Sequence, residues 1–421
     1  MQARSAEVAI IGAGPAGSHL ASRLAAEGRD VVLFDPKGAW EKPCGGGVPT
    51  RAIREFAFIL ESSNYPRKLV RQITMISPLD RHVTLTLDEP FAVYSRQVLN
   101  SLVLDRAIEA GAAFVREGAS DLAREQNGWT ISTDAGNQWR VKFLVGADGA
   151  ASFTRRRLVG IFPKQDLALA FGYNISCPEP SDSLRPMGNA ERVEPAMDEV
   201  VVRFPKDFTG YLWAFPRPGA MNFGVASKLG ERTSIELRTM LTSFVRGHYG
   251  GSMPDPDRVS FFGAKIPTLD LASWKNLQTT GDGWALIGDA AGFADPITGE
   301  GIYYAFKSAD LLADALDTVS VNFDKHEKRK TATGSSSIYR RATSSYETMW
   351  REAFGRDLEH ASFRLPQFYH GFFFGRIFTD ATIRLARHHR GVRTILVRAL
   401  TGDQSYVTLK RDLLRRAWQI F

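Results

Sequence analysis

The sequence predicts an α/β protein with three parts: an α/β domain built from separated segments, an inserted β-rich domain and a helical C-terminal region. An apolar run at residues 7–11, helical spacing at 15–27 and a β-branched run at 31–34 open the chain as a β-α-β unit. Aromatic-rich strand patterns such as "LALAFGYNIS" and "EVVVRF" fill the middle of the chain. Helical patterns dominate after Ser336.

Strand-and-turn patterns that return late in the chain indicate that the α/β domain is discontinuous. Both "RVKFLVGADGAAS" and "GWALIGDAAGF" are typical of a strand that ends in an Asp-containing turn. We therefore assign residues 1–72, 94–165 and 278–322 to the α/β domain, and 73–93 and 166–277 to the β-rich domain. Residues 323–421 form the helical C-terminal region, and the low-complexity segment 325–337 is the best candidate for a linker.

A glycine motif lies between the first strand and the first helix. Gly12, Gly14 and Gly17 in "GAGPAG" have GxGxxG spacing, and Asp35 ends the next strand. The glycines permit a tight turn, close approach of a pyrophosphate and close helix packing, while the helix N-terminus attracts the phosphates. The acidic residue can accept ribose hydroxyls. The motif in this position predicts a dinucleotide site.

Composition narrows the class of protein. The chain has 421 residues and only two cysteines, Cys44 and Cys177, so there is no disulfide framework and no CxxC metal or redox spacing. The first apolar run begins too early to leave room for a signal peptide, and no uninterrupted apolar run reaches about 18 residues. We expect a cytoplasmic protein. His388 and His389 are adjacent and cannot share a helix face, so we expect no metal site.

A second Asp-containing turn makes FAD the expected dinucleotide. Asp289 follows a late strand, and Gly299-Glu300-Gly301-Ile302 then opens a helix. An extended dinucleotide needs an anchor for its flavin half, and a carboxylate can hold the ribityl hydroxyls. The helix N-terminus would stabilise the negative charge of a reduced flavin ring. We therefore predict FAD as cofactor, bound by a Rossmann-like domain of the glutathione reductase type.

These motifs resemble the flavoprotein group typified by para-hydroxybenzoate hydroxylase and, within it, most closely the geranylgeranyl reductase family. The likeness covers about the first 320 residues, through "IIGAGPAGS", "KPCGGGVP", "GADGAAS", "LIGDAAGFADPITGEGI" and "YLWAFP", and "LTGDQSYVTL" is similar to the family's tail. The resemblance implies these cofactor contacts: Gly12, Gly14, Ala16 and Gly17 at the pyrophosphate, Asp35 at the adenosine ribose, Ala119 at the adenine, Arg96 near the pyrophosphate and ribityl chain, Cys44 and Gly45 along the flavin, and Asp289, Gly301 and Ile302, with Gly299 in the same loop, at the ribityl chain and ring.

The family's substrate-domain pattern is PxxYxWxFP. Tyr211, Trp213 and Phe215 match it, but Phe208 replaces the first proline. Strand alternation places the three matching aromatics on one face, which suits a prenyl chain, although an inward core face would have the same pattern. The substitution at Phe208 leaves open how the chain enters this strand and what substrate length is accepted.

The stretch "KPCGGGVPT" leaves the second strand of the β-α-β unit. Backbone contact with a flat flavin ring, or with a substrate chain lying over it, would explain its three glycines. We therefore count Gly46 and Gly47 with the aromatic row as substrate-binding. Two interpretations of Cys44 stay open: a small residue in a tight loop, or a thiol that abuts the flavin and the reacting bond.

The resemblance implies FAD-dependent reduction of isolated C=C bonds in a geranylgeranyl or other polyprenyl chain. Protonation of such an electron-rich alkene generates carbocation character, which aromatic faces can stabilise. This makes Tyr211 and Trp213 candidate catalytic residues, and Cys44 is a third because it would abut the flavin and tune the position or protonation of the alkene. One alternative is an FAD-dependent monooxygenase or halogenase, although "YLWAFP" stands where halogenases usually carry WxWxIP. A non-catalytic FAD-bound lipid-binding protein is another.

The basic charge of the chain is concentrated near its C-terminus. Residues 361–421 hold eleven Arg or Lys and three Asp, a net charge of +8 against +7 for the whole chain. This basic aromatic tail fits a solvated helical face as well as contact with an anionic membrane surface or a phosphorylated ligand. No nucleic-acid module accompanies it. A polyprenyl substrate and an electron donor, either NADPH or ferredoxin, are the expected partners.

Overall fold

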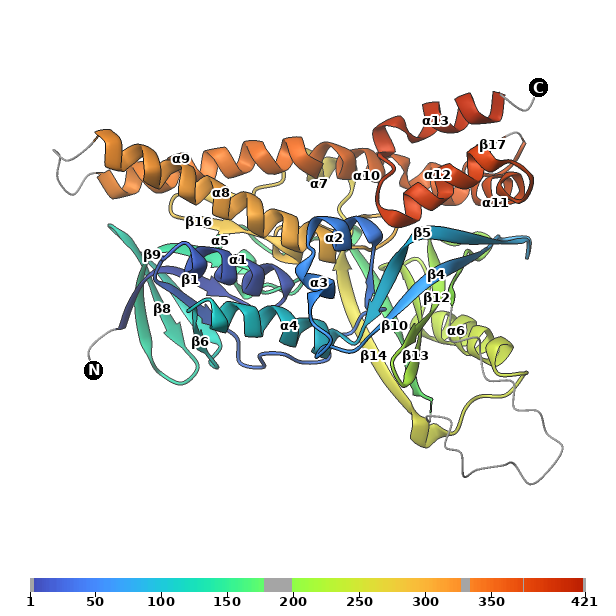
Figure 1. Cartoon of the computed structure of the whole chain (residues 1–421), viewed down its shortest axis with the longest axis horizontal. Helices are drawn as coiled ribbons and strands as arrows, with labels where there is room; N and C mark the ends of the chain where they lie inside the picture. The colour runs from blue at the N-terminus through green and yellow to red at the C-terminus, as the bar shows by residue number, and fades with distance from the viewer. Residues whose placement is uncertain (1–3, 178–198, 327–333, 374, 419–421) are drawn as a thin grey trace. The chain divides into compact units, whose positions relative to one another are not determined.

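The computed structural model describes residues 4–177, 199–326, 334–373 and 375–418 (Figure 1). The chain divides into two compact units. The first contains Met1–Glu41, Gln97–Asp166 and Pro267–Glu359, and the second contains Lys42–Arg96, Leu167–Ile266 and His360–Phe421. Each unit has one large sheet with helices packed on it, which confirms the α/β class with a β-rich part and C-terminal helices.

The first unit is built on an eight-stranded sheet. Five of its strands follow the order β15-β16-β9-β1-β2, β6 lies beyond β2, and β8 pairs with both β7 and β9. The strands are β1 (Arg4–Ile11), β2 (Val31–Phe34), β6 (Ala113–Val115), β7 (Ala119–Glu125), β8 (Gly128–Thr133), β9 (Gln138–Gly146), β15 (Thr280–Gly281) and β16 (Trp284–Leu286). Strand β1 runs parallel to β2 and β9, and its last residue, Ile11, pairs with Phe34 and Gly146.

The ends of three parallel strands bring the three turn motifs to one edge of this sheet. Ile11 pairs with Gly146, and Gly146 pairs with Leu286 of β16. The turns that follow contain Gly12, Asp148 and Asp289 respectively. Because ligands of open α/β sheets bind outside the carboxyl ends of parallel strands, this edge is where a dinucleotide is expected.

Helices cover the first sheet. They are α1 (Pro15–Ala26), α4 (Arg96–Glu109), α5 (Phe153–Leu158), α7 (Leu271–Lys275), α8 (Ile302–His326) and α9 (Gly334–Trp350), with a π-helical turn at Arg351–Gly355. Helix α8 packs along both α1 and α9 (Figure 1). Helix α9 is tied to the sheet edge by two buried side chains: Tyr346 donates its hydroxyl to the Leu286 carbonyl over 3.0 Å, and Trp350 Nε1 donates to Thr279 Oγ1 over 3.0 Å.

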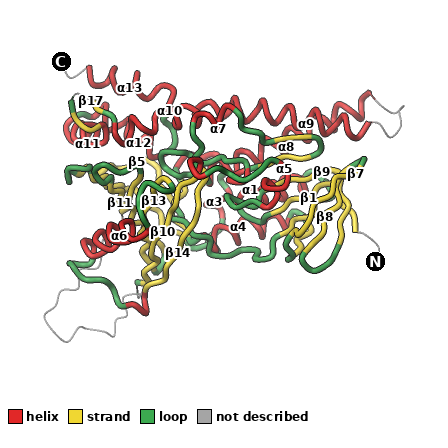
Figure 2. The backbone as a smooth tube through the Cα atoms, turned by 180° about the vertical axis from the view of Figure 1, so that it is seen from behind, coloured by secondary structure: helices red, strands yellow, loops and turns green. Residues whose placement is uncertain are grey.

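The second unit holds the larger antiparallel part of the fold. Its sheet has the order β14-β10-β13-β12-β11-β4-β5-β3, and a separate hairpin joins β17 and β18. The strands are β3 (Gly47–Val48), β4 (Arg67–Ile76), β5 (His82–Tyr94), β10 (Leu167–Ser176), β11 (Glu199–Arg203), β12 (Gly210–Arg217), β13 (Ala220–Lys228), β14 (Val259–Pro267), β17 (Phe372–Phe373) and β18 (Arg376–Ile377). Figure 2 shows these strands in yellow beside helix α6.

Helices of the second unit pack on this sheet at two places. The helices of this unit are α2 (Thr50–Glu55), α3 (Phe58–Glu61), α6 (Ser234–His248), α11 (Phe378–His388), α12 (Arg390–Thr401) and α13 (Tyr406–Trp418), of which α3 packs on α2 and α13 packs on α12. The apolar side of α6, with Leu237, Leu241 and Phe244, packs against Leu212 and Phe223. Helices α2, α11 and α12 lie against β5.

The compact units follow boundaries other than those expected from the motifs. Residues 42–72 fall in the second unit, because Gly47 and Val48 pair with β5 in its sheet. The C-terminal helical region does not form a third body: the boundary falls inside α10 (Arg356–His370), so α9 belongs to the first unit and α11 to α13 belong to the second. Of the expected linker 325–337, residues 327–333 lie outside the described residues, while its ends belong to α8 and α9.

Among the residues that the structure describes, no helix combines the length and the apolar character needed to cross a bilayer.

Candidate functional site

The glycine motif forms a tight turn in the first unit. Gly12 has φ +105°, and a Cβ atom there would lie 2.5 Å from the Ala147 carbonyl oxygen. A Cβ atom at Gly17 would lie 1.9 Å from the Gly12 carbonyl oxygen, so the helix and the turn touch backbone to backbone. Both positions therefore require glycine for packing within the protein.

Gly14 is different, because it faces open space. Apart from Gly14 itself and its chain neighbours, no atom of the described residues lies within 4 Å of the place its Cβ would take. Gly14 is also the N-cap of α1, which has Pro15 in its first turn and receives no capping hydrogen bond from a side chain of the described residues. An uncapped helix N-terminus beneath open space fits the pyrophosphate of FAD, with the amides of Ala16 and Gly17 in the first turn.

Asp35 is held by the backbone of the same turn. Its Oδ2 accepts a hydrogen bond from the Ala13 amide over 2.9 Å, and its Oδ1 accepts from Lys37 and Gly38 over 2.8 and 3.0 Å. Each carboxylate oxygen has two lone pairs, so the fixed carboxylate retains capacity to accept a ribose hydroxyl. Ala119, the residue predicted at the adenine, begins β7 and pairs with Thr133 of β8.

The second predicted anchor lies in the same unit as the glycine motif. A Cβ atom at Gly301 would lie 3.0 Å from Asp289 Oδ1, and one at Gly288 would lie 3.0 Å from the Ala16 methyl carbon. The structure thus brings the late Asp turn beside both the first turn of α1 and the start of α8. At that start, the Tyr303 amide donates to Glu300 Oε1 over 2.8 Å, just after Ile302. Gly299 donates its amide to the Asp295 carbonyl in the preceding loop.

Asp148 shapes the middle turn of this edge. Its carboxylate accepts hydrogen bonds from the Ser152 hydroxyl, the Thr154 amide and the Thr154 hydroxyl. Burial raises the pKa of this carboxyl, and the hydrogen bonds only partly oppose that effect. Arg155 lies directly after Thr154, and the sequence did not point to it. Burial lowers the pKa of its guanidinium to about 10. The guanidinium lies 4.0 Å from the centre of the Phe162 ring.

In the second unit, the loop that carries Cys44 is closed by aromatic side chains of the protein. A Cβ atom at Gly45 would lie 3.0 Å from the Phe215 ring and 3.1 Å from Trp213 Nε1. One at Gly47 would lie 2.6 Å from Phe91 and 2.9 Å from Phe215. These contacts account for two of the three glycines without a cofactor, which the sequence-based interpretation did not foresee.

The middle glycine of the loop is fixed by the backbone. Gly46 has φ +83°, and a Cβ atom there would lie 1.9 Å from the Tyr94 carbonyl oxygen. Its own carbonyl accepts a hydrogen bond from the Tyr94 amide over 2.9 Å. Cys44 is half-buried, and its Sγ accepts a hydrogen bond from the Gly46 amide over 3.3 Å. The thiol is therefore held by the backbone of its own loop. Arg96, which begins α4, is buried in the same unit.

The aromatic row expected from strand alternation lies on β12. The ring centres of Tyr211 and Trp213 are 5.8 Å apart, and those of Trp213 and Phe215 are 6.3 Å apart. The indole of Trp213 lies against Gly224 of the neighbouring strand, where a Cβ atom would be 2.0 Å from the ring. Gly224 is thus a residue that the sequence analysis missed, since only the strand pairing shows that it makes room for the indole.

Phe208, which stands where the family pattern has proline, packs on the other face of the sheet. It is 1% exposed and belongs to the apolar cluster that includes Leu212 and Leu241. Because it faces α6, it anchors the start of β12 without entering the row formed by Tyr211 and its neighbours.

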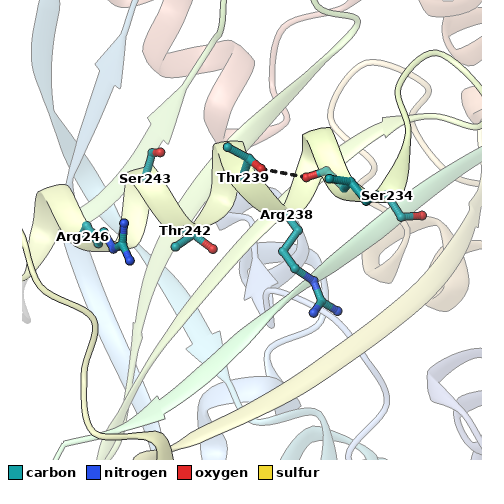
Figure 3. Close-up of a pocket in the computed structure, with 7 residues that line it drawn as sticks. Ser234, Arg238, Thr239, Thr242, Ser243 and Arg246 are labelled. Atoms are coloured by element: carbon teal, nitrogen blue, oxygen red, sulfur yellow. Dashed lines mark hydrogen bonds between the residues drawn. The ribbon is translucent and has the colours of Figure 1, made fainter.

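A cavity of about 540 Å³ lies along the outer side of α6 (Figure 3). Its described lining residues are Ser234, Ile235, Arg238, Thr239, Thr242, Ser243 and Arg246. None of them is a residue that the sequence predicts for FAD or substrate. This cavity is therefore separate from the aromatic row, which alternation places on the face of the sheet away from α6.

Comparisons with known proteins agree with this geometry. A family model described as an FAD binding domain matches residues 5–173. Geranylgeranyl diphosphate reductase of Rhodobacter capsulatus is 29% identical over 318 residues, covering 73% of each chain. The chloroplastic geranylgeranyl diphosphate reductase of Oryza sativa subsp. japonica is 30% identical over 352 residues, which cover 76% of this chain and 68% of that protein.

Solved structures share the fold over nearly the whole chain. A geranylgeranyl bacteriochlorophyll reductase-like protein from Thermoplasma acidophilum has a TM-score of 0.75 at 20% identity, covering 99% of this chain and 100% of that one. A flavin-dependent brominase has a TM-score of 0.67 at 17% identity, with coverage of 99% and 100%.

The fold, the glycine turn and the matching family model define an FAD-dependent oxidoreductase, with FAD as its cofactor. Within that class, the chain belongs to the geranylgeranyl reductase family.

Proposed function

We propose that this protein saturates isolated C=C bonds of a geranylgeranyl or other polyprenyl chain. The observation that carries the proposal is the aromatic row of Tyr211, Trp213 and Phe215, packed directly on the glycine loop that presents Cys44. The relatives from Rhodobacter capsulatus and Oryza sativa are geranylgeranyl diphosphate reductases, which supports the same reaction. Family members are expected to differ mainly in the prenyl substrate they accept.

The first unit would hold the cofactor. Gly12, Gly14, Ala16 and Gly17 would contact the pyrophosphate, Asp35 the adenosine ribose and Ala119 the adenine, with Asp289, Gly299, Gly301 and Ile302 at the flavin half. When bound, FAD supplies the hydride that is added to one carbon of the double bond. We also propose Arg96, Cys44 and Gly45, which belong to the second unit, as FAD contacts.

The residues of the second unit would handle the substrate. The faces of Tyr211 and Trp213 stabilise positive charge on the alkene carbon as the other carbon takes up a proton. Gly46 and Gly47 let the loop pack against the Tyr94 backbone, Phe91 and Phe215, which keeps it close to the aromatic row where a prenyl chain would lie. Burial of that chain provides most of the binding free energy, at roughly 0.8 kcal/mol for each CH₂ group. Cys44 tunes the position or protonation of the double bond.

We also propose the partners of this reaction. The electron donor is NADPH or ferredoxin. The basic residues of α11 to α13, which include the exposed Arg384, Arg387 and Arg415, contact an anionic membrane surface. Sedimentation with vesicles of neutral and anionic lipid tests that contact, because only the anionic vesicles should retain the protein.

The competing function is that of an FAD-dependent monooxygenase or halogenase. The brominase shares the fold alone, and the stretch Tyr211-Leu212-Trp213-Ala214-Phe215-Pro216 lacks the WxWxIP pattern usual in halogenases. Anaerobic photoreduction of the purified holoprotein, followed by geranylgeranyl diphosphate, separates the two functions. We expect reoxidation with a mass gain of two for each saturated bond. Reoxidation only when oxygen is added, with a hydroxylated or halogenated product, would overturn the reductase proposal.

A further inference from the structure

A chain of hydrogen bonds joins the Cys44 loop to the aromatic row, and neither sequence pattern contains it. Arg217 of β12 donates from Nη2 to the Cys44 carbonyl over 2.6 Å and from Nε to the Gly45 carbonyl over 3.4 Å. Its Nη1 donates to Asn174 Oδ1 over 3.2 Å. Asn222 Nδ2 donates to the same Asn174 oxygen over 2.6 Å, and Trp213 Nε1 donates to Asn222 Oδ1 over 2.7 Å.

The chemistry of the side chains allows only one direction along this chain. Trp213 Nε1 and the Arg217 guanidinium can only donate, so the atoms that face them must be oxygens. Asn222 therefore turns its oxygen to the indole and its NH₂ group to Asn174, whose oxygen then serves both Asn222 and Arg217. Every side chain in the series is oriented by the next.

Burial makes these hydrogen bonds costly to lose. Arg217 and Trp213 are each 4% exposed, and Asn222 is fully buried. A buried donor or acceptor that loses its partner keeps the full cost of its desolvation. Arginine is required because its planar fork reaches three acceptors in three directions, whereas a lysine ammonium is a single point with no fixed plane. The arrangement is therefore rigid on both sides of Arg217.

We propose that Arg217 is a positioning residue that holds the Cys44–Gly45 peptide in a fixed place relative to the Trp213 indole, through Asn174 and Asn222. The inference rests on the proposed function, in which the Cys44 thiol and the Trp213 ring face the same double bond. Direct packing supports the same coupling, since Gly45 lies against both Trp213 and Phe215. Loss of Arg217 frees the loop to move away from the row.

The test uses the two cysteines of the chain as paired reporters in the full-length FAD-loaded protein. Both Cys44 and Cys177 are half-buried in the second unit. Iodoacetamide labels them, and mass spectrometry of the peptides gives each alkylation rate in the same sample. We expect Arg217→Lys, which keeps the charge but loses the fork, to raise the rate at Cys44 by roughly fivefold or more. The rate at Cys177 should stay within about twofold of the parent's, because loss of positioning does not unfold the sheet.

Two further variants complete the experiment. Arg258→Lys is the matched control, because Arg258 donates from Nε to the Ser176 carbonyl of β10 over 2.7 Å, away from the chain of hydrogen bonds that ends at Cys44. It should leave the alkylation rate of Cys44 unchanged.

Asn174→Ala removes the shared acceptor while Arg217 stays in place, and should raise the alkylation rate of Cys44 at least twofold. If Arg217→Lys does not fold, this variant tests the proposal in its place.

Equal acceleration at both cysteines would overturn the proposal, because it indicates general loosening, and so would an unchanged Cys44 rate in both network variants. The measurement needs no substrate. A failure of the proposed function appears separately, as a parent protein that labels as expected but forms no saturated prenyl product.

Discussion

Arg54 and Asp403 form a two-point ion pair between helix α2 and the turn that follows α12. Nη1 of Arg54 lies 3.1 Å from Oδ1 of Asp403, and Nη2 lies 3.3 Å from Oδ2. Arg51 of the same helix donates to the Gly402 carbonyl over 3.3 Å, and the Thr401 hydroxyl donates to Asp403 over 2.7 Å. The family-like tail segment "LTGDQSYVTL" is therefore fastened to the helix that directly follows the Cys44 loop.

Replacing Asp403 should weaken this fastening in a pH-dependent way. Burial by itself would raise the pKa of the Asp403 carboxyl, but hydrogen bonds from Arg54 and Thr401 outweigh it, so the pKa is lowered. A carboxyl with a lowered pKa stabilises the fold above its usual titration range, and this contribution is lost as the pH falls through the folded-state value. We expect Asp403→Asn to lower the free energy of unfolding by about 0.5–1 kcal/mol at neutral pH.

Urea unfolding at low and high salt, at neutral pH and near pH 3, measures this effect. The difference between parent and variant should shrink in high salt and at acid pH. Asp257→Asn, at an exposed turn in the same unit, serves as control. An equal difference at both pH values would show that the ion pair is not its source.

His248 should make the second unit less stable in mild acid. Burial among the rings of Phe223 and Phe244 lowers the pKa of its imidazole, although Nδ1 donates to the Phe244 carbonyl over 2.9 Å. As the pH falls below the ordinary histidine range, the unfolded chain takes up a proton that the folded chain does not. The stabilising contribution is thus complete above about pH 7 and declines toward the lowered pKa.

We expect the free energy of unfolding of the parent to fall between about pH 7.5 and 5.5, and His248→Gln to flatten part of that slope. His82→Gln, at an exposed position of β5, should leave the slope unchanged. Identical pH profiles for the parent and His248→Gln would contradict the assignment.

Two glycines of the first turn should fail in different ways when changed to alanine. At Gly14 the new methyl group enters open space above the N-terminus of α1, so stability should change by less than about 0.5 kcal/mol while FAD binding weakens by about tenfold. At Gly12 the methyl group meets the Ala147 carbonyl and φ is +105°, so we expect a loss of about 1–3 kcal/mol. Thermal unfolding without FAD and fluorescence titration with FAD separate these outcomes. Unimpaired FAD binding by Gly14→Ala would place the pyrophosphate elsewhere.

Gly224→Ala should move the Trp213 indole. The added methyl group would lie 2.0 Å from the ring, so the side chain must turn and its hydrogen bond to Asn222 is lost. We expect lower turnover of a prenyl substrate, with the dissociation constant of FAD within about twofold of the parent's. Gly247→Ala is a control in helix α6 of the same unit, because only its chain neighbours and its own helix lie within 4 Å of that Cβ position and its φ is not positive. Full activity of Gly224→Ala would remove Trp213 from the proposed chemistry.

Cys44→Ser tests whether the sulfur takes part. Serine preserves the size and hydrogen bonding of the side chain but not the acidity of a thiol. We expect slower turnover or a different number of saturated bonds, measured by mass spectrometry of the products, while Cys177→Ser behaves as the parent. If both turnover and the number of saturated bonds stay the same, the thiol serves only the shape of the loop.

Local patterns predict those parts of this molecule that depend on neighbours in sequence. The β-α-β opening and the Asp turns after strands were readable because each occupies a short stretch with its own periodicity. The partners of Arg217, the space that Gly224 leaves for Trp213 and the contact of Asp403 with Arg54 all join distant segments. No periodicity encodes them. The register of β12 against β13 shows the space at Gly224, whereas the partners of Arg217 and Asp403 come from segments that meet only in the folded unit.

The glycine loop also depends on contacts that the sequence does not show. Three glycines signal a close approach, but they do not say what approaches. The sequence favoured the flavin or the substrate, whereas Phe215, Trp213 and Phe91 of the chain itself occupy the space beside Gly45 and Gly47. The contact of these rings with the glycines depends on β3 pairing with β5 in the sheet. A strand of two residues is too short to be predicted from its sequence.

The side chains of Trp213 and Phe215 fill the volume that Gly45 and Gly47 leave empty. Substitutions in these two segments are therefore not independent during evolution. A larger residue in the loop demands a smaller ring on β12, and a wider prenyl channel obtained by trimming Phe215 would leave a hole beside Gly45 and Gly47. Substitutions at these four positions should therefore appear together in related sequences, and redesign of chain-length selectivity will have to change both segments in the same step.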